Sequence, residues 1–237
     1  MAITAVITAG GSGSRMHQDI PKQFIMVDER PVIIYTLEVF QKHPEIDAIC
    51  VACLEGWQNV LQAYANQFNI TKLKYIVPGG TTGQESIRNG IFELEKYYSP
   101  DDIVIVHDGN RPMLSPEIIS DNIRVARKNG NAIAAIPCAE VILETSDGIE
   151  SSKSYKRETL RRTQTPHAFK LSDICSLHRR AEKAGITSTA ASCELELKLG
   201  GKVYFSAGSE KNIKLTTLDD IDIFKALLKT ERASWLK

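Results

Sequence analysis

The sequence predicts an α/β fold in which helices cover both faces of a mainly parallel sheet. Short apolar runs typical of buried strands alternate with longer runs that have the spacing of amphipathic helices. No internal repeat, linker or low-complexity segment divides the 237 residues. Alternation of this kind is typical of strand–helix–strand units. We therefore expect a single domain over residues 1–237, with its ligands beyond the carboxyl ends of the strands.

The apolar runs place the strands. The first run lacks a cationic leader and continues directly into a glycine-rich turn, so we expect a strand there rather than a signal peptide. Strands are expected at Ile3–Thr8, Ala48–Leu54, Lys74–Val77, Ile103–His107, Ala132–Pro137 and Lys202–Ala207.

Helical spacing fills most of the intervals between these strands and continues after them. Apolar residues recur three or four positions apart, as one buried face of a helix requires. Helices are expected around residues 33–40, 87–94 and 118–125, and then at Leu171–Lys183, Cys193–Leu199 and Leu218–Leu228.

The segment Val141–Lys156 breaks this pattern. It reads VILETSDGIESSKSYK, with a polar turn around Ser146-Asp147-Gly148 and flanks that can pair as a hairpin. It is too polar to belong to the core. We expect an exposed arm at about residues 139–160.

Composition and charge exclude several classes of protein. Apolar residues make up 43% and charged residues 24%, which is ordinary for a globular protein, and the formal net charge is zero. No global basic field therefore points to nucleic acid or an anionic membrane as a partner. No apolar run reaches the roughly 18 residues that a membrane span needs. Any cationic site has to be local.

The cysteines indicate a reducing compartment. They are five in number and scattered, which fits the cytoplasm better than a disulfide framework. Cys50 and Cys53 form a C-x-x-C, but within the apolar run AICVACL, where strand alternation puts them on opposite faces. No second pair completes a zinc site. We expect buried strand cysteines.

The turn after the first strand is the strongest local signal of function. Gly10, Gly11 and Gly13 allow backbone N–H groups to approach phosphate oxygens, and Arg15 and Lys22 add cations a few residues further on. The competing interpretation is that both cations are solvated loop charges, as most lysines and arginines are. Their position beside a glycine turn and a buried strand favours a nucleoside triphosphate site.

Two other phosphate-binding motifs do not fit this turn. The P-loop pattern G-x-x-x-x-G-K-[ST] is absent. The dinucleotide fingerprint G-x-G-x-x-G matches only its first two glycines, because Met16 occupies the third position. Pro21 also interrupts the long helix that should follow such a turn.

The chain resembles a known family through five motifs that occur in that family's order. AGGSGSRM followed by PKQF resembles the signature of the cytidylyltransferases that act on 2-C-methyl-D-erythritol 4-phosphate and ribitol 5-phosphate. The resemblance runs from about residue 3 to residue 224. It implies a Rossmann-like, three-layer α/β/α nucleotidyltransferase with a protruding β-arm. The other motifs are Gly79-Gly80 with Ser86-Ile87, VHDGNRP at 106–112, Thr165-Pro166 and NIKLT at 212–216.

The reaction that the resemblance implies needs charge compensation more than proton transfer. A phosphate oxygen of the acceptor attacks the α-phosphorus of CTP and releases pyrophosphate. The second pKa of a phosphate monoester is about 6, so the nucleophile is largely dianionic near neutrality and needs no general base. Two unit charges 4 Å apart repel by roughly 4 kcal/mol at an effective dielectric near 20. Fixed cations and a divalent metal can offset that repulsion.

The resemblance assigns the catalytic charges to four residues. Arg15 and Lys22 would hold the triphosphate, and Lys214 would neutralise the α-phosphate from the other side, in a loop shaped by Asn212 and Thr216. Asp108, at the end of an apolar strand, would hold Mg²⁺ among phosphate oxygens. The alternative for Asp108 is an ordinary aspartate at a turn or helix start.

The resemblance also assigns the binding residues. Backbone at Gly80 and Thr81 and the hydroxyl of Ser86 would contact the cytosine and ribose, although Ser86 also suits the N-cap region of the helix that follows. Arg111, Arg157 and Thr165 would bind the acceptor's phosphate, with Arg157 delivered by the neighbouring subunit's arm, which implies a homodimer with arm exchange. The complete expected CTP set is Ala9, Gly10, Gly11, Gly13, Gly80, Thr81 and Ser86.

This chain departs from the family mainly where the acceptor binds. Glu140-Val141 stands where relatives carry Asp-Thr, and Ala190-Ala191 where they carry Thr-Asp; Gly83 replaces an arginine and His167 a glutamine. We therefore expect CTP to remain the donor, with altered contacts to the acceptor.

Three acceptors and one inactive alternative stay open. Ribitol 5-phosphate is the favoured acceptor, because VPGG, the DDIV run at 101–104 and QTP resemble that branch. 2-C-methyl-D-erythritol 4-phosphate, an isoprenoid precursor, and another polyol phosphate are the alternatives. A nucleotide-binding relative that has lost catalysis is a further possibility. Retention of Arg15, Lys22, Asp108 and Lys214 together argues against it.

Overall fold

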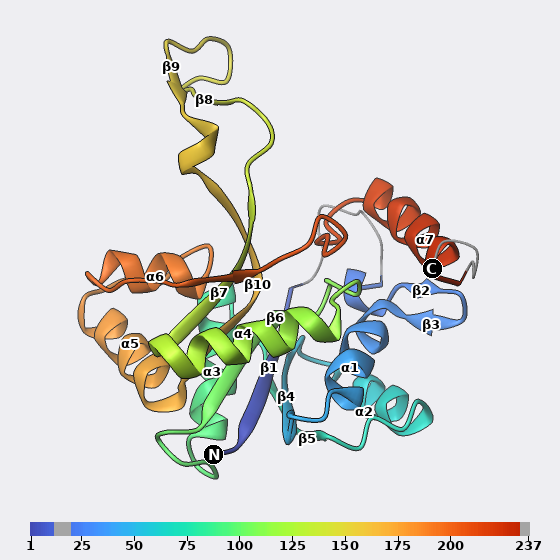
Figure 1. Cartoon of the computed structure of the whole chain (residues 1–237). Coiled ribbons are helices and arrows are strands. Elements are labelled where there is room, and N and C mark those ends of the chain that lie inside the picture. Colours follow the sequence, from blue (N-terminus) through green and yellow to red (C-terminus); the bar gives the residue numbers. More distant parts are fainter. Residues whose placement is uncertain (12–19, 233–237) are drawn as a thin grey trace.

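A seven-stranded sheet forms the centre of the molecule (Figure 1). The computed structural model describes residues 1–11 and 20–232. Every pairing in this sheet is parallel except those of β10, which runs antiparallel to both of its neighbours. The predicted mainly parallel sheet is confirmed. In spatial order the strands are β11 (Phe205–Ala207), β7 (Asn131–Pro137), β10 (Arg161–Lys170), β6 (Ile103–Asp108), β1 (Ile3–Ala9), β4 (Ala48–Cys53) and β5 (Leu73–Pro78).

Helices cover both faces of the sheet. One buried apolar cluster joins alternate strand residues such as Ile7 and Val51 to α1 (Val32–Lys42), α2 (Gln58–Gln67) and α4 (Pro116–Asn129). A second cluster joins the opposite strand face to three other helices. These are α3 (Gly83–Leu94), α5 (Leu171–Lys183) and α6 (Ser192–Lys198).

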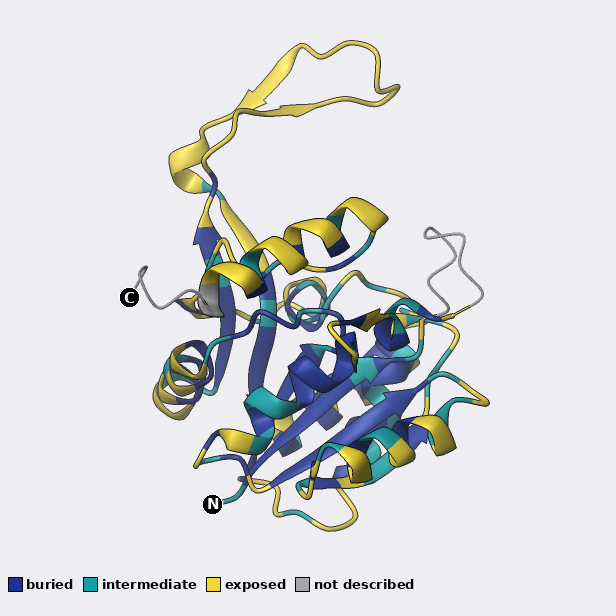
Figure 2. Cartoon of the chain, turned by 90° about the vertical axis from the view of Figure 1, so that its right-hand side faces the viewer, coloured by how far each residue is buried: buried dark blue, intermediate teal, exposed yellow. Residues whose placement is uncertain are grey.

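Burial on both faces explains the sequence of the central strands. A strand covered by helices on each side needs apolar residues at every position, so it reads as a continuous apolar run. Figure 2 shows these strands as the most buried part of the molecule. Cys50 and Cys53 are both buried in β4, and they belong to opposite clusters, as predicted.

Strand β10 was not predicted. Its sequence RRTQTPHAFK begins with two arginines and contains a proline, and it has neither a continuous apolar run nor a strict alternation. Its first three residues are exposed, and its register against β7 shifts between Thr163 and His167. The strand is fixed by pairing with β6 and β7 rather than by its own pattern.

The protruding arm is confirmed. Strands β8 (Ile142–Glu144) and β9 (Lys153–Tyr155) pair antiparallel as a hairpin, at the top of Figure 1. Figure 2 shows the arm exposed along its length. Asp147 stabilises the turn, because its Oδ1 accepts hydrogen bonds from the N–H groups of Ile149 (2.9 Å) and Glu150 (3.2 Å). The short 3₁₀ helix η3 (Arg157–Thr159) follows.

Small elements complete the fold near the glycine turn. The 3₁₀ helix η2 (Lys22–Phe24) leads into the two-stranded β2 (Met26–Val27) and β3 (Arg30–Pro31). Helix α7 (Leu218–Arg232) packs on this region through a separate apolar cluster that includes Tyr35 and Phe224. No helix in residues 1–11 and 20–232 is long and apolar enough to cross a membrane.

Candidate active site

A cavity of about 230 Å³ opens at the carboxyl ends of β1 and β6. Thr8 and Asp108 are register partners on these two strands, so the glycine turn and Asp108 lie at the same edge of the sheet. This is the edge at which parallel α/β sheets bind ligands. The cavity collects nine of the residues that the sequence singled out, namely Ala9, Gly10, Gly11, Lys22, Gly80, Thr81, Ser86, Asp108 and Lys214.

Two predicted residues cannot be placed. Gly13 and Arg15 lie outside the described residues, so their expected contacts with CTP remain predictions. Lys22, seven positions after Arg15, lies in η2 and lines the cavity.

Gln23 holds Lys22 against the glycine turn, a role that sequence reasoning missed. The side chain of Gln23 is buried, and its Nε2 donates to the carbonyls of Ala9 (2.8 Å) and Gly11 (3.1 Å). Phe24 stacks on Trp57, with ring centroids 4.6 Å apart. The PKQF motif therefore contributes a cation to the cavity and also the contacts that fix its position.

The opposite wall is formed by the start of α3. Thr82 is the N-cap, since its hydroxyl accepts from the N–H of Glu85 at 3.1 Å, and the T-x-x-E spacing was the signal that could have predicted this. Ser86 lies within the helix. Its Oγ accepts from the N–H of Gly80 (3.0 Å) and donates to the carbonyl of Thr82 (3.0 Å), which fixes the backbone at the cavity edge.

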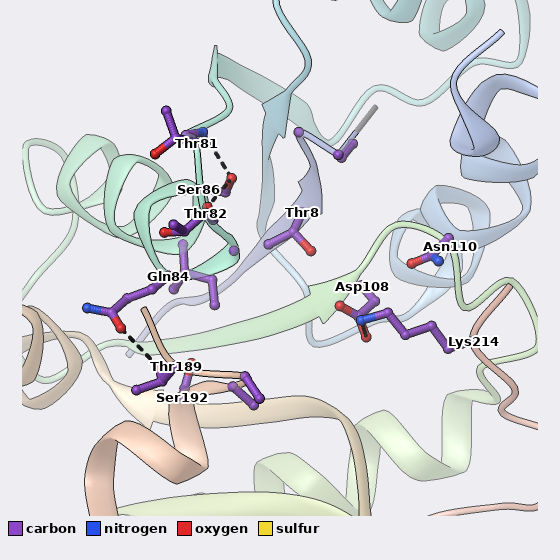
Figure 3. A pocket seen from close by; sticks show the side chains of 18 of the residues that line it. Thr8, Thr81, Thr82, Gln84, Ser86, Asp108, Asn110, Thr189, Ser192 and Lys214 are labelled. Carbon is purple, nitrogen blue, oxygen red and sulfur yellow. Dashed lines mark hydrogen bonds and ion pairs between the residues drawn. The ribbon is translucent and has the colours of Figure 1, made fainter. Parts of the chain in front are cut away.

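Asp108 is the centre of the charged group in the site. Its Oδ2 accepts from Arg111 Nε at 2.9 Å and from Lys214 Nζ at 3.1 Å; Figure 3 shows Lys214 beside Asp108. Burial alone would raise the pKa of Asp108, but Lys214 and then Arg111 outweigh it and hold that pKa well below its usual range. The carboxylate is therefore ionised, and the three groups together carry one net positive charge.

A network of backbone contacts positions the loop that carries Lys214. Arg111 Nη1 donates to the carbonyl of Asn212 at 2.7 Å, and Asn212 Nδ2 donates to the carbonyl of Thr165 at 2.8 Å. The Thr165 hydroxyl in turn accepts from the N–H of Asp108 at 3.1 Å. Asn212 thus shapes the loop, whereas the hydroxyl of Thr216 donates to Asp220 at 2.8 Å, at the start of α7.

A second cavity of about 180 Å³ adjoins the first. Arg111, Thr165 and His167 line only this second cavity, whereas Thr8, Asp108 and Lys214 line both. Asp108 and Lys214 therefore lie in the wall shared by two adjacent spaces, as donor and acceptor sites require.

Two of the departures from the family pattern lie at this boundary. Ala190 and Ala191 line both cavities, so methyl groups stand where the family resemblance predicts a hydroxyl and a carboxylate. Gly83 lines the main cavity, and a Cβ there would meet nothing within 4 Å in the part of the chain that the structure describes. Val141 lies on the arm and is exposed.

Arg157 is not brought to the site within one chain. It lies in η3 at the base of the arm, where its Nη1 donates to the carbonyl of Ala139 at 3.2 Å and its Nε pairs with Glu158 at 3.2 Å. It lines neither cavity.

The donor set suits magnesium only together with a nucleotide. Asp108 supplies one ionised carboxylate in the cavity, and no group of three or more potential ligands from His, Cys, Asp and Glu occurs in the part of the chain that the structure describes. Mg²⁺ in such sites is bound through one or two carboxylates and completed by substrate phosphates and water. The residues present fit this pattern.

Comparisons with known proteins agree with the geometry. The family model described as "IspD: 2-C-methyl-D-erythritol 4-phosphate cytidylyltransferase" matches residues 3–230. A ribitol-5-phosphate cytidylyltransferase from Lacticaseibacillus paracasei is 42% identical, over 96% of this chain and 98% of its own. A 2-C-methyl-D-erythritol 4-phosphate cytidylyltransferase from Clostridium acetobutylicum is 37% identical, over 95% and 96%.

A solved structure agrees as well. The 4-diphosphocytidyl-2C-methyl-D-erythritol synthase from Anaerococcus prevotii superimposes with a TM-score of 0.81 at 28% identity, covering 96% of each chain. The expected three-layer nucleotidyltransferase fold is therefore confirmed. The chain belongs to the IspD family of cytidylyltransferases.

Proposed function

We propose that this protein transfers CMP from CTP to ribitol 5-phosphate, giving CDP-ribitol and pyrophosphate. The observation that carries the proposal is the charged wall of Asp108 and Lys214 shared by two adjacent cavities. The choice of acceptor is supported by relatives named ribitol-5-phosphate cytidylyltransferases at 42% and 40% identity. The alternative acceptor is 2-C-methyl-D-erythritol 4-phosphate, supported by a relative of that name at 37%.

CTP occupies the main cavity in this proposal. The base and ribose lie against the Gly80 backbone that Ser86 fixes, and the triphosphate lies along Gly10 and Gly11. Lys22, on the side of the glycine turn, and Lys214, on the side of Asp108, hold the phosphates between them. Arg15 adds a third cation by family resemblance.

The acceptor occupies the second cavity, with its phosphate between Arg111 and Lys214. One of its phosphate oxygens attacks the α-phosphorus of CTP, the new P–O bond forms, and the bond to the pyrophosphate oxygen breaks. Arg111 and Lys214 lower the repulsion between the two anions and stabilise the charge that accumulates in the transition state. No residue has to remove a proton, because the attacking phosphate is already ionised.

Asp108 acts in two ways in this scheme. It holds the cations of Arg111 and Lys214 at 2.9 and 3.1 Å before substrates arrive. It also provides the carboxylate that would hold Mg²⁺ beside the triphosphate. A bound Mg²⁺ would neutralise phosphate charge and stabilise the leaving pyrophosphate.

A second subunit completes the acceptor site in our proposal. Arg157 is exposed on the arm and lines neither cavity of its own chain, so it can reach an acceptor only in another copy of the protein. The arm also exposes Val141 (71%) and Ile149 (88%), apolar surface that a homodimer would cover. We place this homodimer in the cytoplasm, where the five free, buried cysteines would stay reduced.

An acceptor panel tests the proposal. Pyrophosphate release is measured with CTP and Mg²⁺ and with ribitol 5-phosphate, 2-C-methyl-D-erythritol 4-phosphate or a shorter polyol phosphate in turn. The highest kcat/KM is expected with ribitol 5-phosphate. Preference for another acceptor would correct the substrate, and CTP binding without release from any of them would indicate a catalytically inactive relative.

Substitution of the cations tests the mechanism. Lys22→Ala and Lys214→Ala should each lower kcat by roughly 10²- to 10³-fold, the usual effect of removing one transition-state charge contact. Lys211→Ala is the matched control, because Lys211 is an exposed lysine in the same loop as Lys214 and lines neither cavity. Turnover near wild type in either cavity variant would contradict charge compensation.

A further inference from the structure

Gln84 links the nucleotide side of the cavity to its acceptor side. It lies in the first turn of α3, two residues before Ser86, and only 8% of it is exposed. Its Nε2 donates to the carbonyl of Ile186 at 2.7 Å, and its Oε1 accepts from the Thr189 hydroxyl at 3.0 Å. Both ends of the amide therefore bind the loop between α5 and α6, which Figure 3 shows for Thr189.

That loop leads directly into the boundary of the two cavities. Ala190, Ala191 and Ser192 follow Thr189, and all three line both cavities. The two alanines have no polar side-chain atoms, so this segment can contact an acceptor only through its backbone and the Ser192 hydroxyl. That hydroxyl oxygen is buried and has no hydrogen-bond partner within residues 1–11 and 20–232.

When a segment recognises a ligand through backbone atoms, its affinity for that ligand depends on the contacts that fix its backbone. Within residues 1–11 and 20–232, the other hydrogen bonds of this loop are long or join it to its own flanking helices, and Ala191 also packs against the second apolar cluster. The carbonyl of Thr187 accepts from Thr82 Oγ1 at the long distance of 3.4 Å, and the N–H of Ala190 donates to Glu194 at 2.6 Å, within the same segment and α6. Gln84 supplies the two shorter contacts to α3, which is the helix that also carries Ser86.

We propose that Gln84 is a positioning residue for the acceptor. By binding the loop before residues 190–192, it fixes their backbone relative to the first turn of α3, which contacts the nucleotide in our proposal. The inference rests on the proposed cytidylyltransferase function. Its substrate class is the same polyol phosphate. Gln84 and Thr189 line the main cavity, but the Gln84 amide is bonded at both ends to the loop, so the role assigned to the pair is in acceptor affinity rather than in direct contact with CTP.

Steady-state kinetics of Gln84→Ala and Thr189→Val test the proposal. Gln84→Ala should raise the KM for the polyol phosphate roughly tenfold and leave the KM for CTP within about twofold. Thr189→Val removes only the bond to Oε1 and should raise the acceptor KM by about threefold. Thr189 is half-buried in a loop, so this variant keeps the proposal testable if Gln84→Ala does not fold.

Arg88→Ala is the matched control. Arg88 lies one turn further along α3, where it pairs with Glu85 (3.2 Å) and Glu182 (2.6 Å), and it lines neither cavity of the site. Its loss also breaks contacts between α3 and its surroundings, but the acceptor KM should not change. An acceptor KM that is unchanged in Gln84→Ala, or a CTP KM that rises equally, would overturn the proposal.

Hydrogen exchange separates this proposal from the proposed function. With CTP bound and no acceptor present, backbone amides of residues 186–192 should exchange faster in Gln84→Ala than in the wild type or in Arg88→Ala. Equal exchange in all three proteins would overturn the positioning role even if CMP transfer is observed. If the wild type transfers CMP to no acceptor, the proposed function fails, and the exchange comparison still decides the role of Gln84.

Discussion

The absence of a side chain at Gly79 allows a close contact with Gly10 at the edge of the site. A Cβ on Gly79 would lie 2.6 Å from the Cα of Gly10 and 3.1 Å from the carbonyl oxygen of Cys53. These neighbours are backbone atoms, so they cannot rotate away as a flexible side chain would. The absence of side chains at the two glycines therefore allows the chain that follows β1 and the chain that follows β5 to approach closely beside the main cavity.

Substituting these glycines should have unequal effects on stability. Gly79→Ala is expected to lower the free energy of unfolding by about 1–3 kcal/mol, the usual range for overpacking a filled space. Gly11→Ala in the same region is the control: a Cβ there meets nothing within 4 Å among residues 1–11 and 20–232, and the expected change is within about 0.5 kcal/mol. Urea denaturation measures both. Equal stability of the two variants would show that the backbone relaxes around the added methyl group.

The catalytic residues that the sequence predicted are charged, whereas the site residues that it missed are uncharged. Lys22 carries a charge beside a glycine turn, so its type and position already indicated phosphate chemistry, and the family resemblance of their motifs indicated Asp108 and Lys214. Gln23 and Gln84 carry no charge. Their roles depend on carbonyl and hydroxyl groups that folding brings near, as the bond from Gln84 to Ile186, 102 positions away, illustrates.

At the scale of elements, the predicted strands were visible in their local sequence, whereas β10 depends on contacts that form only on folding. The central predicted strands β1, β4 and β6 are buried on two faces, and their continuous apolar runs reflect that burial. Strand β10 is defined by hydrogen bonds to β6 and β7, which no local pattern in RRTQTPHAFK records. Helix α2 was missed as well, because its sequence QNVLQAYANQ buries only Leu61 and Ala65. The arm was predictable because a polar run cannot form core.

The arm leads to a prediction about shared sites. Arg157→Ala and Lys214→Ala should each be nearly inactive as pure homodimers. If Arg157 acts in the neighbouring subunit's site, a mixed dimer has one site with both residues intact. Random exchange makes about half of the dimers mixed, with one intact site of two, so activity should recover to about a quarter of wild type. Pyrophosphate release from the mixture, after a cycle of dissociation and reassociation, measures this.

The matched control for that experiment is a mixture of Lys22→Ala with Lys214→Ala. Both residues line the same cavity of the same chain, so each mixed dimer still has one defect in every site. No recovery is expected there. Recovery in this control, or none in the Arg157 mixture, would exclude delivery of Arg157 by a partner's arm.

At the scale of the whole molecule, buried histidines tie stability to pH. His43, His107, His167 and His178 are all buried, and burial is the main cause that lowers the pKa of each. The pKa falls to about 3 for His107, to about 4 for His167 and to about 4 for His178. These imidazoles are neutral in the folded state at pH values where they would be protonated in the unfolded chain.

The sign of the pH dependence follows from this difference. Below the ordinary histidine pKa of about 6.5 the unfolded chain binds protons that the folded chain does not, so stability falls as pH falls. Between pH 7 and pH 5 the free energy of unfolding should decrease, by on the order of 2 kcal/mol for His178 alone. His178→Gln should show a correspondingly smaller decrease in urea denaturation. A decrease identical to that of the wild type would mean that His178 titrates normally when folded.

The chain enters and leaves the arm through the neighbouring strands β7 and β10, which are paired side by side within the sheet. Residues added or removed at the tip of the hairpin therefore leave the register of every core strand intact. In the homodimer that we propose, such a change would alter the surface that one copy offers to the other, while the strand that carries Asp108 would keep its place in the sheet.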